Sequence, residues 1–156
     1  MAMRNYTADD LHHVSLEGHL RRCAEMYFGS RGPNPEYIAS HIAEGALILG
    51  ARSTLVTHRE GWWYVCADVD WLRIPTTDGV NEQTVFQTIW AFPEAGVNWH
   101  RSEALARVYS DKAFSISEDA IYRVKGDLPT DQALRVHVSR LGSWSRIIGF
   151  RFQNAV

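Results

Sequence analysis

Apolar residues recur every three or four positions in two stretches of the N-terminal third, which predicts two amphipathic helices. The first begins at a capping pair, Thr7 and Asp10, and continues to about residue 26. The second follows Asn34, a favourable N-cap residue, has Pro35 in its first turn and ends at Gly50. Its expected buried stripe is Tyr37, Ile38, Ile42, Ala46 and Leu49.

The rest of the chain predicts strands and two shorter helices. Strands are expected at 53–58, 62–68, 113–117, 121–124, 134–139 and 145–152, and helices at 81–90 and 102–109. The first two strands flank the tight Arg59-Glu60-Gly61 turn, and the fifth alternates apolar and polar residues from Leu134 to Ser139. This order predicts an α+β fold, a two-layer α/β sandwich whose mostly antiparallel sheet carries its helices on one face.

Length and composition limit the function classes. A chain of 156 residues suits one domain, here residues 1–156, and a net charge of −2 argues against a nucleic-acid partner. Cys23 and Cys66 are far apart and form no CxxC motif, which is typical of reduced thiols. We find neither a leader pattern nor an apolar run long enough to span a membrane, so we expect a cytoplasmic protein without membrane association.

The sequence lacks the usual signatures of metal and nucleophile chemistry. It contains no HExxH motif, no cysteine–histidine group at zinc spacing and no GxSxG elbow. We therefore expect no metal and no cofactor. The six Trp, six Tyr and six Phe residues are many for this length, and some of them can line an apolar pocket.

An ordered set of segments resembles the GHKL ATPases, in particular the N-terminal ATPase domain of the DNA gyrase B subunit. The set begins with Leu16-Glu17-Gly18 and Met26-Tyr27-Phe28-Gly29, and His41 to Ala46 resembles the helix motif of the family. It continues with the 53–68 hairpin, Ile74-Pro75-Thr76, the helix after Asn81 and Phe150-Arg151-Phe152. The resemblance spans roughly residues 16–152 and implies the family's fold with its lid deleted.

The departures from the family pattern imply that ATP hydrolysis is lost. In the preferred register, the family's catalytic glutamate and magnesium-binding asparagine fall at His41 and Gly45; in the alternative register they fall at Ile38 and Ile42. The adenine-binding aspartate falls at Val69. The two glycines of the nucleotide loop fall at Trp71 and Arg73, and the late-strand threonine falls near Ile148. Phosphate binding needs close backbone donors and a cation, so the resemblance implies a changed ligand.

The leading hypothesis is a former nucleotide pocket retuned for an apolar small molecule. On this hypothesis His41 is a general base, with Asp70, Asp68 or Glu44 as its partner. Arg73 anchors the ligand, and the remaining lining residues are Trp71, Ile74, Pro75 and Ile148. Such a site fits a cofactor-independent acid/base enzyme of secondary metabolism, of the cyclase, isomerase or lyase type.

Other interpretations stay open. His41 can be an ordinary surface histidine, Arg73 can be a solvated loop arginine, and the other Trp residues can be core residues, whereas Trp71 is expected to fill or reshape the pocket. A domain that resembles gyrase can act as an immunity or self-resistance protein that binds a protein partner. It can also sense a nucleotide without hydrolysing it. The oligomeric state is open, and a homodimer is compatible with the family.

Overall fold

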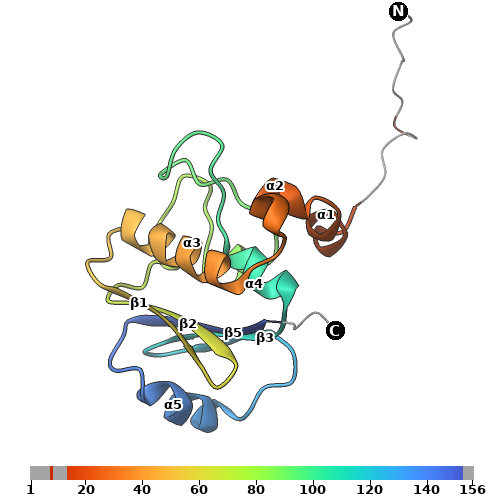
Figure 1. The fold of residues 1–156 in the computed structure, drawn as a ribbon. Coiled ribbons are helices and arrows are strands. Elements are labelled where there is room, and N and C mark those ends of the chain that lie inside the picture. The colour runs from red at the N-terminus through yellow and green to blue at the C-terminus, as the bar shows by residue number, and fades with distance from the viewer. Residues whose placement is uncertain (1–7, 9–13, 153–156) are drawn as a thin grey trace, which may run out of the picture.

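The computed structural model describes residue 8 and residues 14–152, which form one sheet with helices packed on it (Figure 1). The elements in chain order are α1 (Leu16–Arg22), α2 (Ala24–Phe28), η2 (Gly29–Arg31), α3 (Pro35–Ile48), β1 (Thr54–Arg59), β2 (Trp62–Ala67), η3 (Thr84–Phe86), α4 (Glu103–Tyr109), β3 (Ser110–Ser117), β4 (Ile121–Lys125), α5 (Asp131–Ser139) and β5 (Arg146–Phe152). The expected α+β class with an antiparallel sheet is confirmed.

The five strands lie in the order β1-β2-β5-β3-β4, and all neighbours are antiparallel. The last strand therefore enters between two hairpins that are distant in sequence, which makes β5 the centre of the sheet. Gly149 of β5 lies under the ring of Phe114 on β3, where a Cβ would approach the ring to 2.5 Å. Only glycine allows the two strands to pack this closely.

The predicted β1–β2 hairpin is confirmed. Arg59 pairs with Trp62, which leaves Glu60 and Gly61 as a two-residue turn. Both turn residues have positive φ, 52° and 82°, as a type I′ turn requires. The turn twists the two strands in the direction that the sheet needs, so the local sequence is enough to set their register.

The helices α1 to α4 cover one face of the sheet and enclose the larger apolar core. Asn34 caps α3 as predicted, its side chain accepting a hydrogen bond from Tyr37 N at 3.0 Å. The first predicted helix differs: it is two short helices that meet at Cys23, and Ser15 caps the first of them. Its expected start at Thr7 and Asp10 lies outside the described residues.

The segment predicted as a strand at 134–139 is wrong, because it forms the helix α5. Leu134 and Val138 are one helical turn apart and pack on the second face of the sheet, whereas Val136 is 62 % exposed. Thr130 caps the helix by accepting a hydrogen bond from Ala133 N. Positions 134 and 138 satisfy both a period of two and a helical turn, so alternation alone was a misleading signal. The sheet thus carries α5 on the face expected to lack helices.

The ten-residue helix predicted after Asn81 is also wrong. Asn81 does act as a cap, since its Oδ1 accepts from Gln83 N and Thr84 N, but only the 3-10 turn η3 follows. The indole Nε1 of Trp90 donates to Thr84 O at 2.8 Å. This bond folds the segment back on itself, and a continuous helix would not allow it.

No helix within residue 8 and residues 14–152 is long and apolar enough to cross a membrane.

Candidate functional site

The loop after β2 divides its side chains between the interior and the surface. Trp71 is 0 % exposed, and its Nε1 donates to Oε1 of the buried Glu103 at 3.1 Å. The next three residues after Leu72, namely Arg73, Ile74 and Pro75, keep part of their surface accessible. A segment expected to line a single pocket therefore contributes to two different environments.

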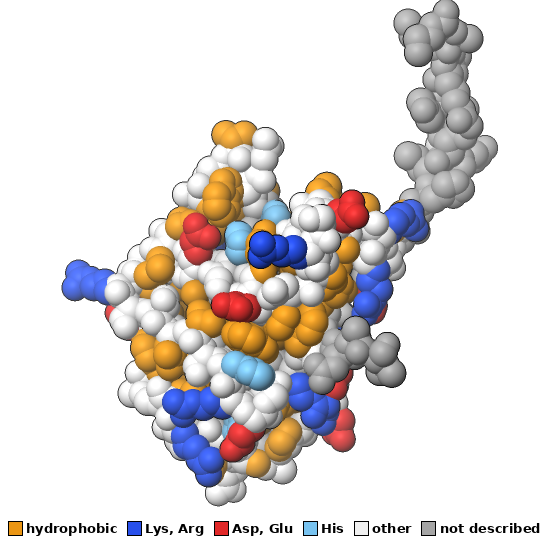
Figure 2. All heavy atoms as spheres, viewed as in Figure 1, with side chains coloured by type: hydrophobic (Ala, Val, Ile, Leu, Met, Phe, Trp, Pro, Cys, Tyr) orange, Lys and Arg blue, Asp and Glu red, His pale blue; other side chains and the backbone are white. Residues whose placement is uncertain are grey.

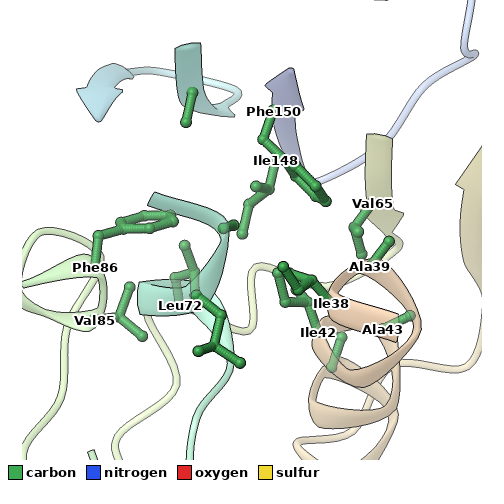
Figure 3. Packing of buried hydrophobic residues seen from close by; sticks show 14 of the residues in the cluster. Ile38, Ala39, Ile42, Ala43, Val65, Leu72, Val85, Phe86, Ile148 and Phe150 are labelled. Carbon is green, nitrogen blue, oxygen red and sulfur yellow. The ribbon is translucent and has the colours of Figure 1, made fainter. Parts of the chain in front are cut away.

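The space between α3 and the sheet is filled by apolar side chains (Figure 3). Ile38 and Ile42 of α3 belong to the same buried cluster as Ile148 of β5. Trp71 and Leu72 complete this cluster from the loop. Interiors packed in this way leave little room for a ligand. Trp71 and Ile148, both expected to bind substrate, therefore present no surface to one in this conformation.

An excursion of the chain over residues 90–101 covers the C-terminal half of α3. Phe92 N donates to Trp99 O and Arg101 N donates to Trp90 O, both at 2.8 Å, so the excursion is closed like a hairpin. It places the Phe92 ring against Gly45, where a Cβ would lie 3.5 Å from the ring. The position that the resemblance assigns to the magnesium ligand therefore faces an aromatic ring.

Arg146, the first residue of β5, organises a group of charges beside the loop. Its side chain is 0 % exposed, and its Nε and Nη2 donate to the two carboxylate oxygens of Asp70 at 2.8 and 2.9 Å. The same Nη2 donates to Glu82 at 2.6 Å, and Nη1 donates to Ser115 Oγ at 3.0 Å. Asp70 is thus held in a bidentate pair, the strongest kind of ion pair geometry.

Arg73 extends this network towards solvent. Its Nε and Nη2 donate to Glu82 at 3.2 and 3.3 Å, and its Nη1 donates to Asp119 at 2.9 Å. Because Asp119 lies in the β3–β4 turn, Arg73 connects the loop after β2 to the β3–β4 hairpin. Its side chain remains 40 % exposed.

The arginines also help to lower the pKa of two carboxyl groups in the network, Glu82 and Asp119. Burial alone would raise the pKa of Glu82, but hydrogen bonds from Arg146 and Arg73 outweigh it and lower that pKa. The pKa of Asp119 is lowered by hydrogen bonds from Ser117 and then from Arg73. The lowered pKa values keep both carboxylates negative at neutral pH.

An open depression of about 590 Å³ lies beside the network, lined by residues 72–76 and 79–83. Its apolar lining comes from Leu72, Ile74, Pro75 and Val80, and its charged lining from Arg73 and Glu82. Three of the five predicted substrate-binding residues, Arg73, Ile74 and Pro75, thus meet at one surface site.

His41 and Glu44 lie on another part of the molecule, on α3. Their closest contact is 3.9 Å, between His41 Nδ1 and Glu44 Oε2. The His41 ring is packed against Tyr37, with 4.0 Å between the ring centroids, and lies 6.5 Å from Trp99. The structure brings two of the three predicted catalytic residues together, and Arg146 holds the third, Asp70.

A second histidine group lies near His41, where the excursion meets α2. His19 Nε2 is 3.0 Å from the Tyr27 hydroxyl, and the His100 ring packs edge-on against Tyr27. Burial, and then the neighbouring His41, lower the pKa of His100. Figure 2 shows histidine side chains at the base of the excursion, with apolar side chains at its tip. A neutral His100 suits a packing role for this group.

Sequence reasoning missed Arg146, Glu82 and Ser115 as parts of the site. A signal was available for Arg146, because an arginine that directly precedes the apolar run Ile147-Ile148 in a central strand must have carboxylate partners. The partners could not be identified in the same way, since Asp70 and Glu82 are 76 and 64 residues away.

Within the described ranges, no group of three or more histidine, cysteine, aspartate or glutamate side chains is arranged to hold a metal ion. The chain matches no protein-family model, and no curated protein matches its sequence significantly.

Proposed function

We propose that this chain is a GHKL-like, non-hydrolysing binding protein that takes an apolar small molecule in the depression lined by residues 72–83. The observation that carries the proposal is the meeting of Arg73, Ile74 and Pro75 at this depression, beside a wall fixed by the buried Arg146. Small-molecule sites combine an apolar lining with a few fixed polar groups, and this depression has both.

The charged lining of the depression, Arg73 and Glu82, indicates which chemical groups a ligand needs. Glu82 and Arg73 hold each other in place, so neither has to be ordered when a ligand arrives. Thr76 Oγ1, in the lining, is buried without a hydrogen-bond partner among the described residues. We therefore propose a ligand with an apolar body and one polar group that donates or accepts a hydrogen bond at this wall.

Binding is favoured over acid/base catalysis, because the proposed general base is not at the depression. His41 and Glu44 lie on α3 and are not among the lining residues. Asp70 contributes both carboxylate oxygens to Arg146. A general base must be within hydrogen-bond reach of its substrate, and no lining residue is a histidine.

A thermal-shift screen of small apolar molecules with one polar group tests the proposal. Hits should raise the Tm of the native chain, and Ile74→Glu should abolish the shift by placing a charge in the apolar lining. Val97→Glu, a matched change on the exposed excursion, should leave the shift intact. Hits that bind Ile74→Glu equally well would contradict the proposed site. Calorimetric titration with ATP and magnesium should show no heat, and binding would favour a nucleotide sensor.

A second function, binding of a protein partner as in an immunity or self-resistance protein, is favoured by the tip of the excursion. Val97 is 88 % exposed and Trp99 is 41 % exposed, and exposed aromatic residues are common binding hot spots. Capture from lysates of cells that make gyrase-directed toxins tests this function. Trp99→Ala should lose a captured partner, whereas Ile74→Glu should retain it.

A further inference from the structure

The edge strand β1 is open to pairing along its outer side. Its six residues, Thr54 to Arg59, pair with β2 in an uninterrupted register. No backbone hydrogen bond from another described segment reaches it. The strand contains no proline, and its only charged side chain besides His58 is the terminal Arg59. Edges of this kind are templates for another strand unless a charge, a bulge or a cover blocks them.

The direction of the free backbone groups follows from one hydrogen bond. Asp68 N donates to Ser53 O, which continues the β1–β2 ladder by one pair. Along an antiparallel strand, residues whose N–H and C=O groups bond to the neighbouring strand alternate with residues whose N–H and C=O groups point to the opposite side. Ser53 therefore faces β2, and Thr54, Val56 and His58 direct their N–H and C=O groups outward.

We propose that a second copy of this chain pairs with β1 in an antiparallel, two-fold symmetric register centred on Val56. Thr54 then lies opposite His58 of the second copy, and each Val56 lies opposite the other. All three outward-facing residues are used, which gives roughly six backbone hydrogen bonds across the axis. Centring on Thr57 would use only Val56 and His58, so the register on Val56 satisfies more backbone groups.

The side chains agree with this self-pairing. No charged residue lies opposite a like charge, because Arg59 falls beyond the Thr54–His58 pair. The two Val56 side chains meet on the face covered by α1 to α4 and form an apolar cross-strand pair. The last turn of α3, a few residues before β1, leaves Leu47 and Ile48 exposed on the same copy. These exposed residues are available to extend the contact.

The opposite edge, β4, is protected where β1 is not. It carries Arg123 and Lys125 within five residues, and a bulge interrupts its pairing with β3 between Ala113 and Phe114. The Arg123 guanidinium also holds the segment that follows the strand, by donating to Pro129 O and Asp131 at 2.7 Å. The difference between the edges predicts pairing through β1 and not through β4.

Light scattering after size exclusion, over a concentration series of the full chain, tests the proposal. The native chain should shift from monomer to dimer as its concentration rises. Val56→Lys places two lysines opposite each other and should raise the dimer dissociation constant more than about tenfold. Val56→Glu should do the same, and an equal mixture of the two variants should restore the dimer. Val124→Lys, the matched change on β4, should leave the dissociation constant unchanged.

Amide hydrogen exchange supplies a measurement that does not depend on folded variants. In the native chain, the amides of Thr54, Val56 and His58 should become more protected as the concentration rises, and those of Leu55 and Thr57 should stay protected throughout. A chain that remains monomeric at every concentration, or a dimer that both Val56 variants leave intact, would overturn the proposal. Capture of an unrelated extended peptide by a monomeric chain would overturn it as well.

Discussion

The two sides of the loop after β2 lie in different environments, one buried and one at the surface, although their residues are neighbours in the chain. On the inner side, Trp71 fills the space under α3 together with Ile148, and Leu72 belongs both to this interior and to the lining of the depression. On the outer side, Arg73 to Thr76 line a depression of about 590 Å³. The resemblance to the GHKL family would assign all of these residues to one nucleotide pocket. The structure instead separates a closed interior from an open surface.

One loop can therefore help to fill the interior and line a surface depression beside it. A tryptophan buries about 150–250 Å² of surface, so the fully buried Trp71 fills much of the space under α3. The polar groups around it then need partners: Glu103 accepts from Trp71 and from Arg101, and Asp70 accepts from Arg146. These hydrogen bonds fix the polar side chains around Trp71 and beside the depression.

Among the substitutions in these two regions, Trp71→Ala should lower the free energy of unfolding the most. Removing a fully buried tryptophan costs about 3–5 kcal/mol and also leaves Glu103 without one of its donors. Urea unfolding measures the change. Added indole should recover part of the stability by entering the cavity. A loss below about 1 kcal/mol would mean that the space under α3 is not packed as described.

The next largest effect should follow from Arg146→Ala. The substitution removes the bidentate partner of Asp70 and leaves Glu82 with Arg73 alone, and losing one partner of a buried ion pair costs about 3–5 kcal/mol. Arg151 on the same strand offers a matched control, because its pair with Asp111 is more exposed than the one around Arg146. Arg151→Ala should cost less than about 1 kcal/mol. Equal losses in the two variants would contradict a special role for the buried arginine.

An intermediate effect is expected from acid. The pKa of Glu82 is lower in the folded chain than its ordinary value of 4.5. The unfolded chain then binds more protons in acid, so this stabilisation is present above that value and is lost as the pH falls through the folded pKa. Glu82→Gln should lower the unfolding free energy at pH 7 and flatten its decline in acid. Glu118→Gln, at an exposed position, should leave the unfolding free energy at pH 7 unchanged.

The smallest effect on stability is expected for Arg73→Ala. Its guanidinium is 40 % exposed and its partner Asp119 is 68 % exposed, and ion pairs of this kind contribute about 0–1 kcal/mol. The substitution should instead weaken binding of any ligand found in the thermal-shift screen. Thermal unfolding and titration of the same variant measure both effects. A loss of several kcal/mol in stability with unchanged ligand affinity would assign Arg73 to the fold and not to the site.

The sequence predicted an element correctly where a short-range signal, such as a cap or a turn, agreed with the tertiary packing around it. Asn34 with Pro35 marks the start of α3, and Glu60-Gly61 marks the β1–β2 turn, because capping and positive φ depend on the residues themselves. At 134–139 and 81–90 the local signal was ambiguous or too weak, and packing on the sheet or a bond from Trp90 decided the conformation.

The candidate site shows the same limit. Arg73, Ile74 and Pro75 could be selected as neighbours in one loop, and the structure places them at one depression. The burial of Trp71 and the pairing of Asp70 with Arg146 could not be selected in that way. Both depend on residues more than thirty positions away in the chain.

By itself, the sequence determined the class of the fold, the caps and turns of its clearest elements and the loop on which the candidate site lies. These follow from short-range steric and hydrogen-bonding preferences. Three features follow from the tertiary structure alone: α5 covers the second face of the sheet, the space under α3 is filled, and no other described segment pairs with the outer side of β1. Those features depend on which distant side chains bury one another, and that is settled only when the whole core packs.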